Sequence, residues 1–173
     1  MKKEHLAMIS IIDYLKKIFV ELLPNIDDPI FEFYFLYQVI EYFINEIMYI
    51  EQDDMIKNYK KGSTASEIRN SVNELLSSLD EKSRINKFVN KYTKTDFQAI
   101  SHDSVQIMKD FFSNNSLDVT VNNFSDGLYC TRNYFFHNHF RILNISGLDL
   151  INIHITNFIC DAISSYNTEV HIT

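Results

Sequence analysis

Glycine and proline are scarce in this chain, with three and two copies among 173 residues. A protein made of many short strands needs frequent tight turns, and these two residues are the usual turn formers. Their scarcity argues against an all-β fold. Cysteine is also scarce: Cys130 and Cys160 are too few for a disulfide framework. The N-terminal segment lacks the apolar core of a signal peptide, so we expect a reduced, cytoplasmic protein.

Positive charge is also in short supply. The chain has 16 Lys and Arg residues against 23 Asp and Glu, which gives a formal net charge of −7. Proteins that coat nucleic acid through their whole surface are usually basic. The composition therefore excludes that class, and any contact with RNA or DNA must be local.

The chain also lacks an uninterrupted apolar span. The best candidate, IFEFYFLYQVIEYFINEIMYI at positions 30–50, contains Glu32, Glu41 and Glu46. Acidic side chains within a membrane span are costly in lipid. This segment is therefore predicted to be a buried helix or a subunit interface, and we expect no contact with a membrane.

What the chain does contain is a series of long helical patterns. Asp28 before Pro29 predicts a helix start, because Asp caps free backbone amides and Pro is tolerated at the first helical position. Thr64 with Glu67, and Ser146 with Asp149, resemble capping boxes. We expect one all-α helical bundle over residues 1–173, with a loop near 114–123. The predicted helices cover residues 4–23, 29–52, the stretch after Thr64, 81–92, 96–112, 125–142 and 148–163.

The most specific pattern lies in the sixth of these helices, within LYCTRNYFFHNHF at positions 128–140. Arg132, Asn133 and His137 form an R-N-x-x-x-H pattern that resembles the signature of the HEPN superfamily (higher eukaryotes and prokaryotes nucleotide-binding). In that family the motif lies near the start of a late helix, often after an aliphatic–aromatic pair such as Leu128–Tyr129. The resemblance implies an HEPN-like bundle, a homodimer in which two motifs line one cleft, and metal-independent cleavage of RNA.

These residue types fit the chemistry of RNA cleavage without a metal. Histidine handles protons because its ordinary pKa is near neutrality. Arginine stabilises a charged phosphorane because its planar fork stays protonated. Asn133 shares a helical face with His137 and would orient the imidazole or bind a phosphate oxygen. Arg132 lies about 140° from His137 around an ideal helix, so its long side chain must bend back.

Each of these residues also has a purely structural interpretation. Arg132 would then be an ion-pair partner, His137 a satisfied histidine at a helix interface, and Asn133 a structural hydrogen-bonding or surface residue. The neighbouring Tyr134, Phe135 and Phe136 are predicted to be packing residues.

Two further clusters are candidates for supporting roles. Gln38, Glu41 and Asn45 form a narrow polar strip, in which Glu41 would hold Arg132 in place. The alternative is that this strip is the solvent face of the helix. A run of basic residues, from Lys82 to Lys94, contains no acid and is a candidate contact for the RNA backbone, the alternative being a solvated face. Its members on one helical face are Arg84, Lys87, Lys91 and Lys94, and Arg141 adds local positive charge near the motif.

The leading hypothesis is a metal-independent endoribonuclease of HEPN type, acting as a toxin or effector in a microbial toxin–antitoxin or antiphage system. Its expected partners are RNA, a second copy of the chain, and an antitoxin or other defence protein. The alternatives are a catalytically inactive HEPN-like module for dimerisation or for nucleotide or RNA binding, and an unrelated helical interaction protein. We expect no cofactor and no metal site. His139 stands where some HEPN toxins carry a modified Tyr, which argues against that mode of control.

Overall fold

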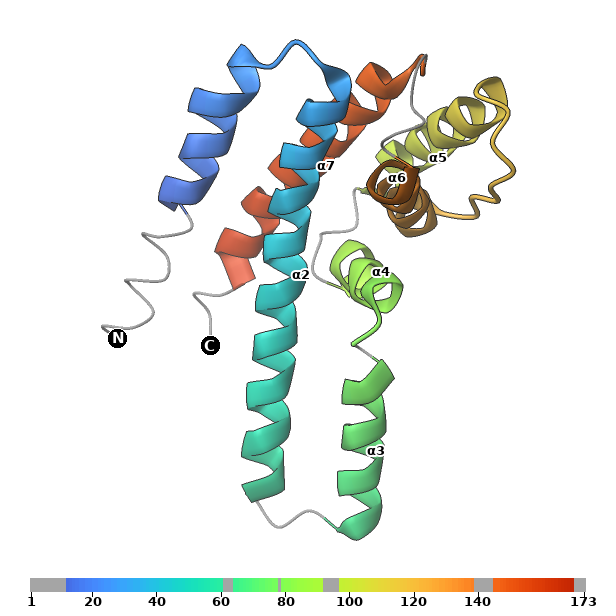
Figure 1. Cartoon of the computed structure of the whole chain (residues 1–173). Coiled ribbons are helices and arrows are strands. Elements are labelled where there is room, and N and C mark those ends of the chain that lie inside the picture. The colour runs from blue at the N-terminus through green and yellow to red at the C-terminus, as the bar shows by residue number, and fades with distance from the viewer. Residues whose placement is uncertain (1–11, 61–63, 78, 92–96, 139–144, 170–173) are drawn as a thin grey trace.

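The computed structural model describes residues 12–60, 64–77, 79–91, 97–138 and 145–169, and every regular element in these ranges is helical (Figure 1). The prediction of an all-α protein is thereby confirmed. Residues 12–16 are helical and lead into a π-helix, Lys17–Leu22, and a 3-10 turn, Leu23–Asn25. The α-helices that follow are α2 (Pro29–Lys60), α3 (Ala65–Ser77), α4 (Glu81–Lys91), α5 (Phe97–Asn114), α6 (Phe124–Asn138) and α7 (Leu148–Glu169).

Two of the predicted helix starts have the expected capping contacts. The backbone N–H of Ile30 donates to Asp28 Oδ1 at 2.7 Å, which caps α2. The backbone N–H of Thr64 donates to Glu67 Oε2 at 2.6 Å, and the N–H of Glu67 donates back to Thr64 Oγ1 at 3.3 Å. This reciprocal pair is a capping box and fixes the start of α3.

The start of α7 differs from the expectation. The backbone N–H of Ser146 donates to the Oδ1 of Asn115 at 3.3 Å, and Asn115 Nδ2 donates to the carbonyl of Ser146 at 3.1 Å. A side chain from the end of α5 therefore fills the place that Asp149 was expected to take. This contact ties the end of α5 to the start of α7.

Helix α2 is the central element and is longer than predicted. It continues to Lys60, whereas the sequence pattern placed its end near Gln52. Its buried residues recur mainly at helical spacing, as expected for an amphipathic helix: Phe33, Leu36, Tyr37, Val39, Ile40, Phe43, Ile44 and Ile47. The extension past Gln52 pairs with α3, so the end of α2 is set by a tertiary partner. None of the described helices combines the length and apolarity that a membrane crossing requires.

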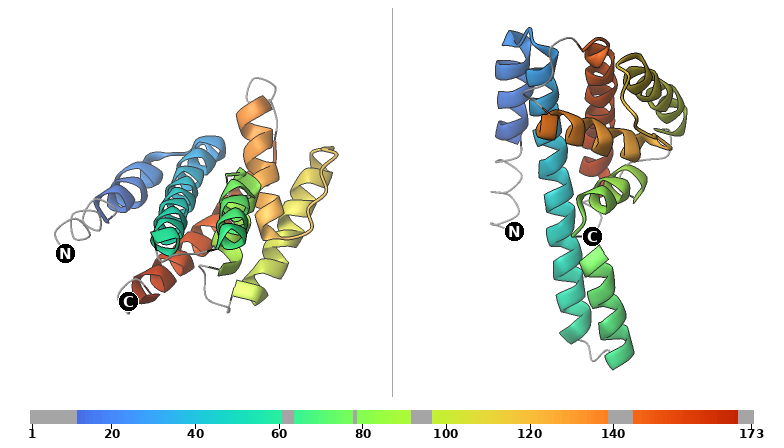
Figure 2. Two further views of the ribbon diagram at one scale, coloured as in Figure 1. Left: turned by 90° about the horizontal axis from the view of Figure 1, so that it is seen from below. Right: turned by 45° about the vertical axis from the view of Figure 1, so that its right-hand side comes forward.

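The helices are arranged around α2 in two parts. In Figure 1 the N-terminal helical segment lies on one side of α2, while α4, α5 and α6 lie on the other, and α7 packs behind α2. The second half of α2 and α3 form a hairpin that projects below these helices. Figure 2 shows α6 running across the direction of α2. This crossing brings the middle of α6 close to both α2 and α4.

Close packing against α5 determines the position of α6. A Cβ atom added to Gly127 would overlap the sulfur of Met108, so the Met108 side chain packs directly over this glycine. Farther along α6, Phe135 is fully buried and its ring lies 5.3 Å from that of Phe33 in α2. The position of α6 is therefore fixed before the R-N-x-x-x-H motif, at Gly127, and within it, at Phe135.

Candidate functional site

The start of α6 is defined by its cap and by an ion pair with α4. The backbone N–H of Asp126 donates to the side chain of Asn123 at 2.8 Å, as expected for an N-cap. Lys82 Nζ of α4 lies 2.8 Å from Asp126 Oδ1. The helix containing the motif is thus anchored to α4 before the motif begins.

Arg132 lies one to two turns farther along α6 and points toward α4. Its Nε atom is 3.2 Å from Glu81 Oε1, with side chains that are 21% and 20% exposed. The N–H of Nε does not meet the geometry of a hydrogen bond, so the contact is an ion pair between half-buried groups. In addition, the hydroxyl of Tyr37 in α2 donates to the same carboxylate oxygen at 2.7 Å. One oxygen of Glu81 therefore joins α2, α4 and α6.

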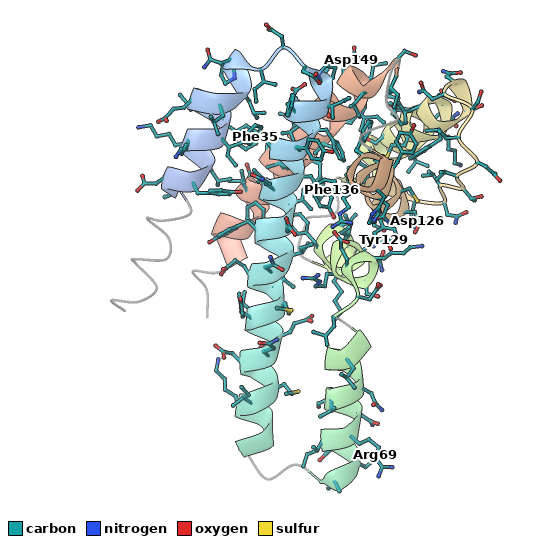
Figure 3. The ribbon with its side chains drawn as sticks, in the orientation of Figure 1. Phe35, Arg69, Asp126, Tyr129, Phe136 and Asp149 are labelled. Atoms are coloured by element: carbon teal, nitrogen blue, oxygen red, sulfur yellow. The ribbon has the colours of Figure 1, made fainter. Side chains whose placement is uncertain are left out.

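Two neighbours within α6 hold the rest of the Arg132 side chain. The guanidinium carbon lies 4.7 Å from the centre of the Phe136 ring, a cation–π arrangement. Nη1 donates to Asn133 Oδ1 at 3.0 Å. Figure 3 shows Phe136 on the side of α6 that faces α2, where its ring packs against Tyr34 with centroids 4.7 Å apart. The guanidinium is thus bounded by a carboxylate, an aromatic face and an amide.

Glu81 is itself placed by the start of α4. The backbone N–H and the hydroxyl of Ser83 donate to Asp80 Oδ2 at 2.9 and 3.0 Å, so Asp80 is the N-cap of this helix. Glu81 is then in the first turn, where the helix dipole favours a negative charge. The short sequence Asp80–Glu81 therefore provides both a helix cap and a fixed carboxylate.

Tyr37 is the buried end of this network, with 1% of its surface exposed. Burial raises the pKa of its hydroxyl well above the usual value, and the hydrogen bond to Glu81 raises it further. The phenol is therefore neutral throughout the physiological pH range and serves as a donor.

His137 is placed differently from Arg132. It is exposed, in the last described turn of α6, four residues after the half-buried Asn133. The structure therefore brings Arg132 and Asn133 into direct contact and leaves His137 at the surface, one turn farther along. The expected packing of the intervening aromatic residues is confirmed: Phe135 is fully buried, and Tyr134 and Phe136 pack against the core.

The carboxylate that contacts Arg132 is Glu81, whereas the sequence pattern suggested Glu41 for this role. Glu41 and Gln38 are exposed, as the alternative interpretation of the polar strip expected. Asn45, the third member of the strip, is half-buried and accepts a hydrogen bond from Arg84 Nη1 at 2.7 Å. Among the described residues, the ion pair of Arg132 is with Glu81 alone.

Three described basic side chains of α4 contact other helices of the chain. Arg84 is bonded to Asn45, and Lys87 Nζ lies 2.8 Å from Glu51 Oε2 of α2. Lys82 pairs with Asp126. These three contacts join α4 to α2 and α6. Arg84 and Lys87 are therefore partly buried and bonded within the chain, and a contact of these residues with RNA stays a prediction. The side chain of Lys91, together with Lys94 and Arg141, lies outside the described residues.

Neither thiol chemistry nor metal binding has support in the described parts of the chain. Cys130 and Cys160 are free thiols, and burial raises the pKa of Cys130, which makes it a weaker nucleophile. No group of three or more His, Cys, Asp or Glu residues there could hold a metal ion. The hollow next to His154 is lined by residues of α5 and α7, none of which belongs to the motif: Asp103, His154, Asn157, Cys160 and Asp161.

Sequence reasoning missed Tyr37 and Glu81. Each carried a weak signal. Tyr37 occurs among the core positions of α2, and a buried phenol needs a hydrogen-bond partner. Glu81 is the acidic residue that immediately precedes the basic run at the start of a predicted helix. Neither signal indicates that the partner is Arg132, because Glu81 and Arg132 are 51 positions apart in the chain and the crossing of α4 with α6 is a property of the fold.

Comparison with known proteins adds no relative: no family model, no curated protein and no solved structure matches this chain.

Proposed function

We propose that this chain is a metal-independent endoribonuclease of HEPN type, acting as a toxin or effector in a microbial toxin–antitoxin or antiphage system. The proposal rests on one observation above all. The arginine of the R-N-x-x-x-H pattern is held half-buried by Glu81, Asn133 and Phe136, and the histidine of the same pattern is exposed on the same helix. A fixed cation and an accessible imidazole on one helix are two groups that phosphoryl chemistry uses.

The reaction is an internal transfer at phosphorus. The 2′-oxygen of a ribose forms a bond to the adjacent phosphorus, and the bond from phosphorus to the 5′-oxygen of the next nucleotide breaks. The proton lost by the 2′-hydroxyl is balanced by one gained at the 5′-oxygen. The products are a 2′,3′-cyclic phosphate and a 5′-hydroxyl. His137 would transfer protons, Arg132 would stabilise the phosphorane charge, and Asn133 would position one of the two.

A second copy of the chain and an antitoxin or other defence protein are the proposed protein partners. The exposed position of His137 supports the first of these. A single imidazole cannot act as base and acid at the same instant, whereas two copies would supply one group for each step.

RNA cleavage in EDTA tests the proposal. We expect the purified protein to cleave a mixed RNA substrate, and the Arg132→Ala and His137→Ala variants to lose at least about 100-fold in rate. Arg69→Ala is the matched control, because Arg69 is exposed on α3, far from the motif (Figure 3). Equal cleavage by all four proteins would indicate a contaminating nuclease and contradict the proposal.

One observation favours the alternative, a catalytically inactive module for dimerisation or for nucleotide or RNA binding. Two cations at or near the motif in the described part of the chain are paired: Arg132 with Glu81, and Lys82 with Asp126. Such pairing lowers the local attraction for phosphate. A folded homodimer that binds RNA or nucleotide without cleaving any of a varied set of RNAs would support this second function.

A further inference from the structure

Glu81 is the one acidic side chain of the described residues in contact with Arg132, and it is fixed from two sides. Asp80 caps the helix in which it lies, and the hydroxyl of the buried Tyr37 donates to its Oε1 at 2.7 Å. These two contacts therefore restrict the position of the carboxylate. A fixed carboxylate beside a guanidinium determines the orientation of the planar group.

The contacts of Arg132 leave part of the guanidinium available. Nε faces Glu81, and Nη1 donates to Asn133. Nη2 forms no hydrogen bond with any of the described residues. It is also not among the side-chain atoms that are buried without a partner. The group thus retains N–H donors for an anion after its position has been fixed by the chain.

We propose that Glu81, held by Tyr37, is the positioning residue of the site: it orients the Arg132 guanidinium so that the remaining N–H groups meet a ribose-linked phosphate of RNA. This inference rests on the ribonuclease function proposed above. Glu81 touches neither RNA nor the reacting atoms, and it acts through Arg132. It also opposes phosphate binding in the ground state, because its charge lies next to the cation.

The two effects of Glu81 predict opposite changes in kcat and KM for Glu81→Gln. The amide keeps the size of the side chain and removes its charge. We expect kcat to fall about 10- to 100-fold because the guanidinium is no longer held in place. KM should fall roughly 2- to 5-fold because the competing charge is gone. Partial unfolding would lower kcat and leave KM unchanged.

Two variants complete the test. Tyr37→Phe keeps the charge of Glu81 and removes one of its hydrogen bonds, so kcat should fall several-fold without any decrease in KM. Asp126→Asn is the matched control, because it breaks the other ion pair between α4 and α6 and does not touch Arg132. Its kcat and KM should both stay within about twofold of the wild type. An unchanged kcat and KM in Glu81→Gln would overturn the inference.

The Nε–H signal of Arg132 in ¹⁵N NMR separates this inference from the proposed function. We expect exchange of this proton with water to be faster by about tenfold or more in Glu81→Gln and unchanged in Asp126→Asn, since only the first variant releases the guanidinium. An unchanged rate in Glu81→Gln overturns the positioning role, whatever the kinetics show. A different outcome is that the wild type cleaves no RNA while the Nε–H proton still exchanges faster in Glu81→Gln than in the wild type. That result would support the role of Glu81 in orienting Arg132 and overturn the ribonuclease function.

Discussion

Two consecutive turns of α6 differ in how tightly the fold holds them. In the turn of Arg132, the side chain is 21% exposed and is in contact with Glu81, Asn133 and Phe136. In the next turn, His137 is exposed. The fold thus determines the orientation of the cation and leaves the imidazole accessible. We therefore expect changes near Arg132 to affect stability as well as function, and changes at His137 to affect function alone.

The largest difference is expected between Phe135→Ala and His137→Ala. Phe135 is fully buried against Phe33 and Phe111, so its truncation should lower the free energy of unfolding by about 3–5 kcal/mol. His137→Ala should change it by less than about 0.5 kcal/mol, as is usual for an exposed position. Urea unfolding of both variants gives the comparison. A large decrease in the free energy of unfolding of His137→Ala would show that His137 also has a structural role.

The next largest effect is expected for Arg132→Ala, at about 2 kcal/mol of unfolding free energy. The substitution leaves the half-buried Glu81 carboxylate without its cation, and partial exposure moderates the cost. The double variant Arg132→Ala/Glu81→Gln should recover part of this loss, because the stranded charge is then gone. Arg69→Ala on α3 is the control and should be neutral. If the double variant recovers none of the lost unfolding free energy, that result would contradict the ion pair.

Alkaline pH should lower the free energy of unfolding through Tyr37, the residue that holds Glu81 beside Arg132. Burial, and then the hydrogen bond to Glu81, raise the pKa of Tyr37 in the folded state. The stabilisation by the neutral phenol is complete below the pKa of the unfolded chain, about 10, and is lost as the pH rises above it. We expect the unfolding free energy to drop by about 1 kcal/mol between pH 10 and pH 11, and Tyr37→Phe to remove that part of the slope. Denaturant titrations from pH 8 to pH 11 measure it.

The smallest effect is expected at the start of α6. Burial opposes ionisation of Asp126, but the hydrogen bonds from Lys82 and Asn122 outweigh it and lower the pKa. The resulting stabilisation is present above the pKa of the unfolded aspartate and is lost as the pH falls through the folded pKa. Asp126→Asn should cost about 0.5–1 kcal/mol at pH 7, and the two proteins should become equally stable near pH 2. Thermal unfolding at both pH values checks this.

The helical fold could be predicted because its determinants are local. Asp28 before Pro29, and Thr64 with Glu67, mark helix starts by hydrogen bonds that span only a few residues. The end of α2 could not be predicted in this way. Nothing in its sequence stops it at Gln52, and pairing with α3 carries it to Lys60.

The partners of the motif were less predictable for the same physical reason. Glu41 and Glu81 are equally acidic in the sequence, and only the crossing of α4 and α6 decides which of them meets Arg132. The partners of the basic residues of α4 likewise depend on the fold. Its periodicity defines a face, but the direction in which that face points depends on α2, which supplies Asn45 and Glu51 as partners.

The central claim is that Arg132 and His137 form a metal-independent ribonuclease site, and the 3′ ends of the cleaved RNA test it most directly. Mass spectrometry of fragments produced in EDTA should detect 2′,3′-cyclic phosphates with the wild type and with Arg69→Ala, and none with Arg132→Ala or His137→Ala. Intact RNA after incubation with the folded wild-type protein, or the same fragments from all four proteins, would contradict the claim.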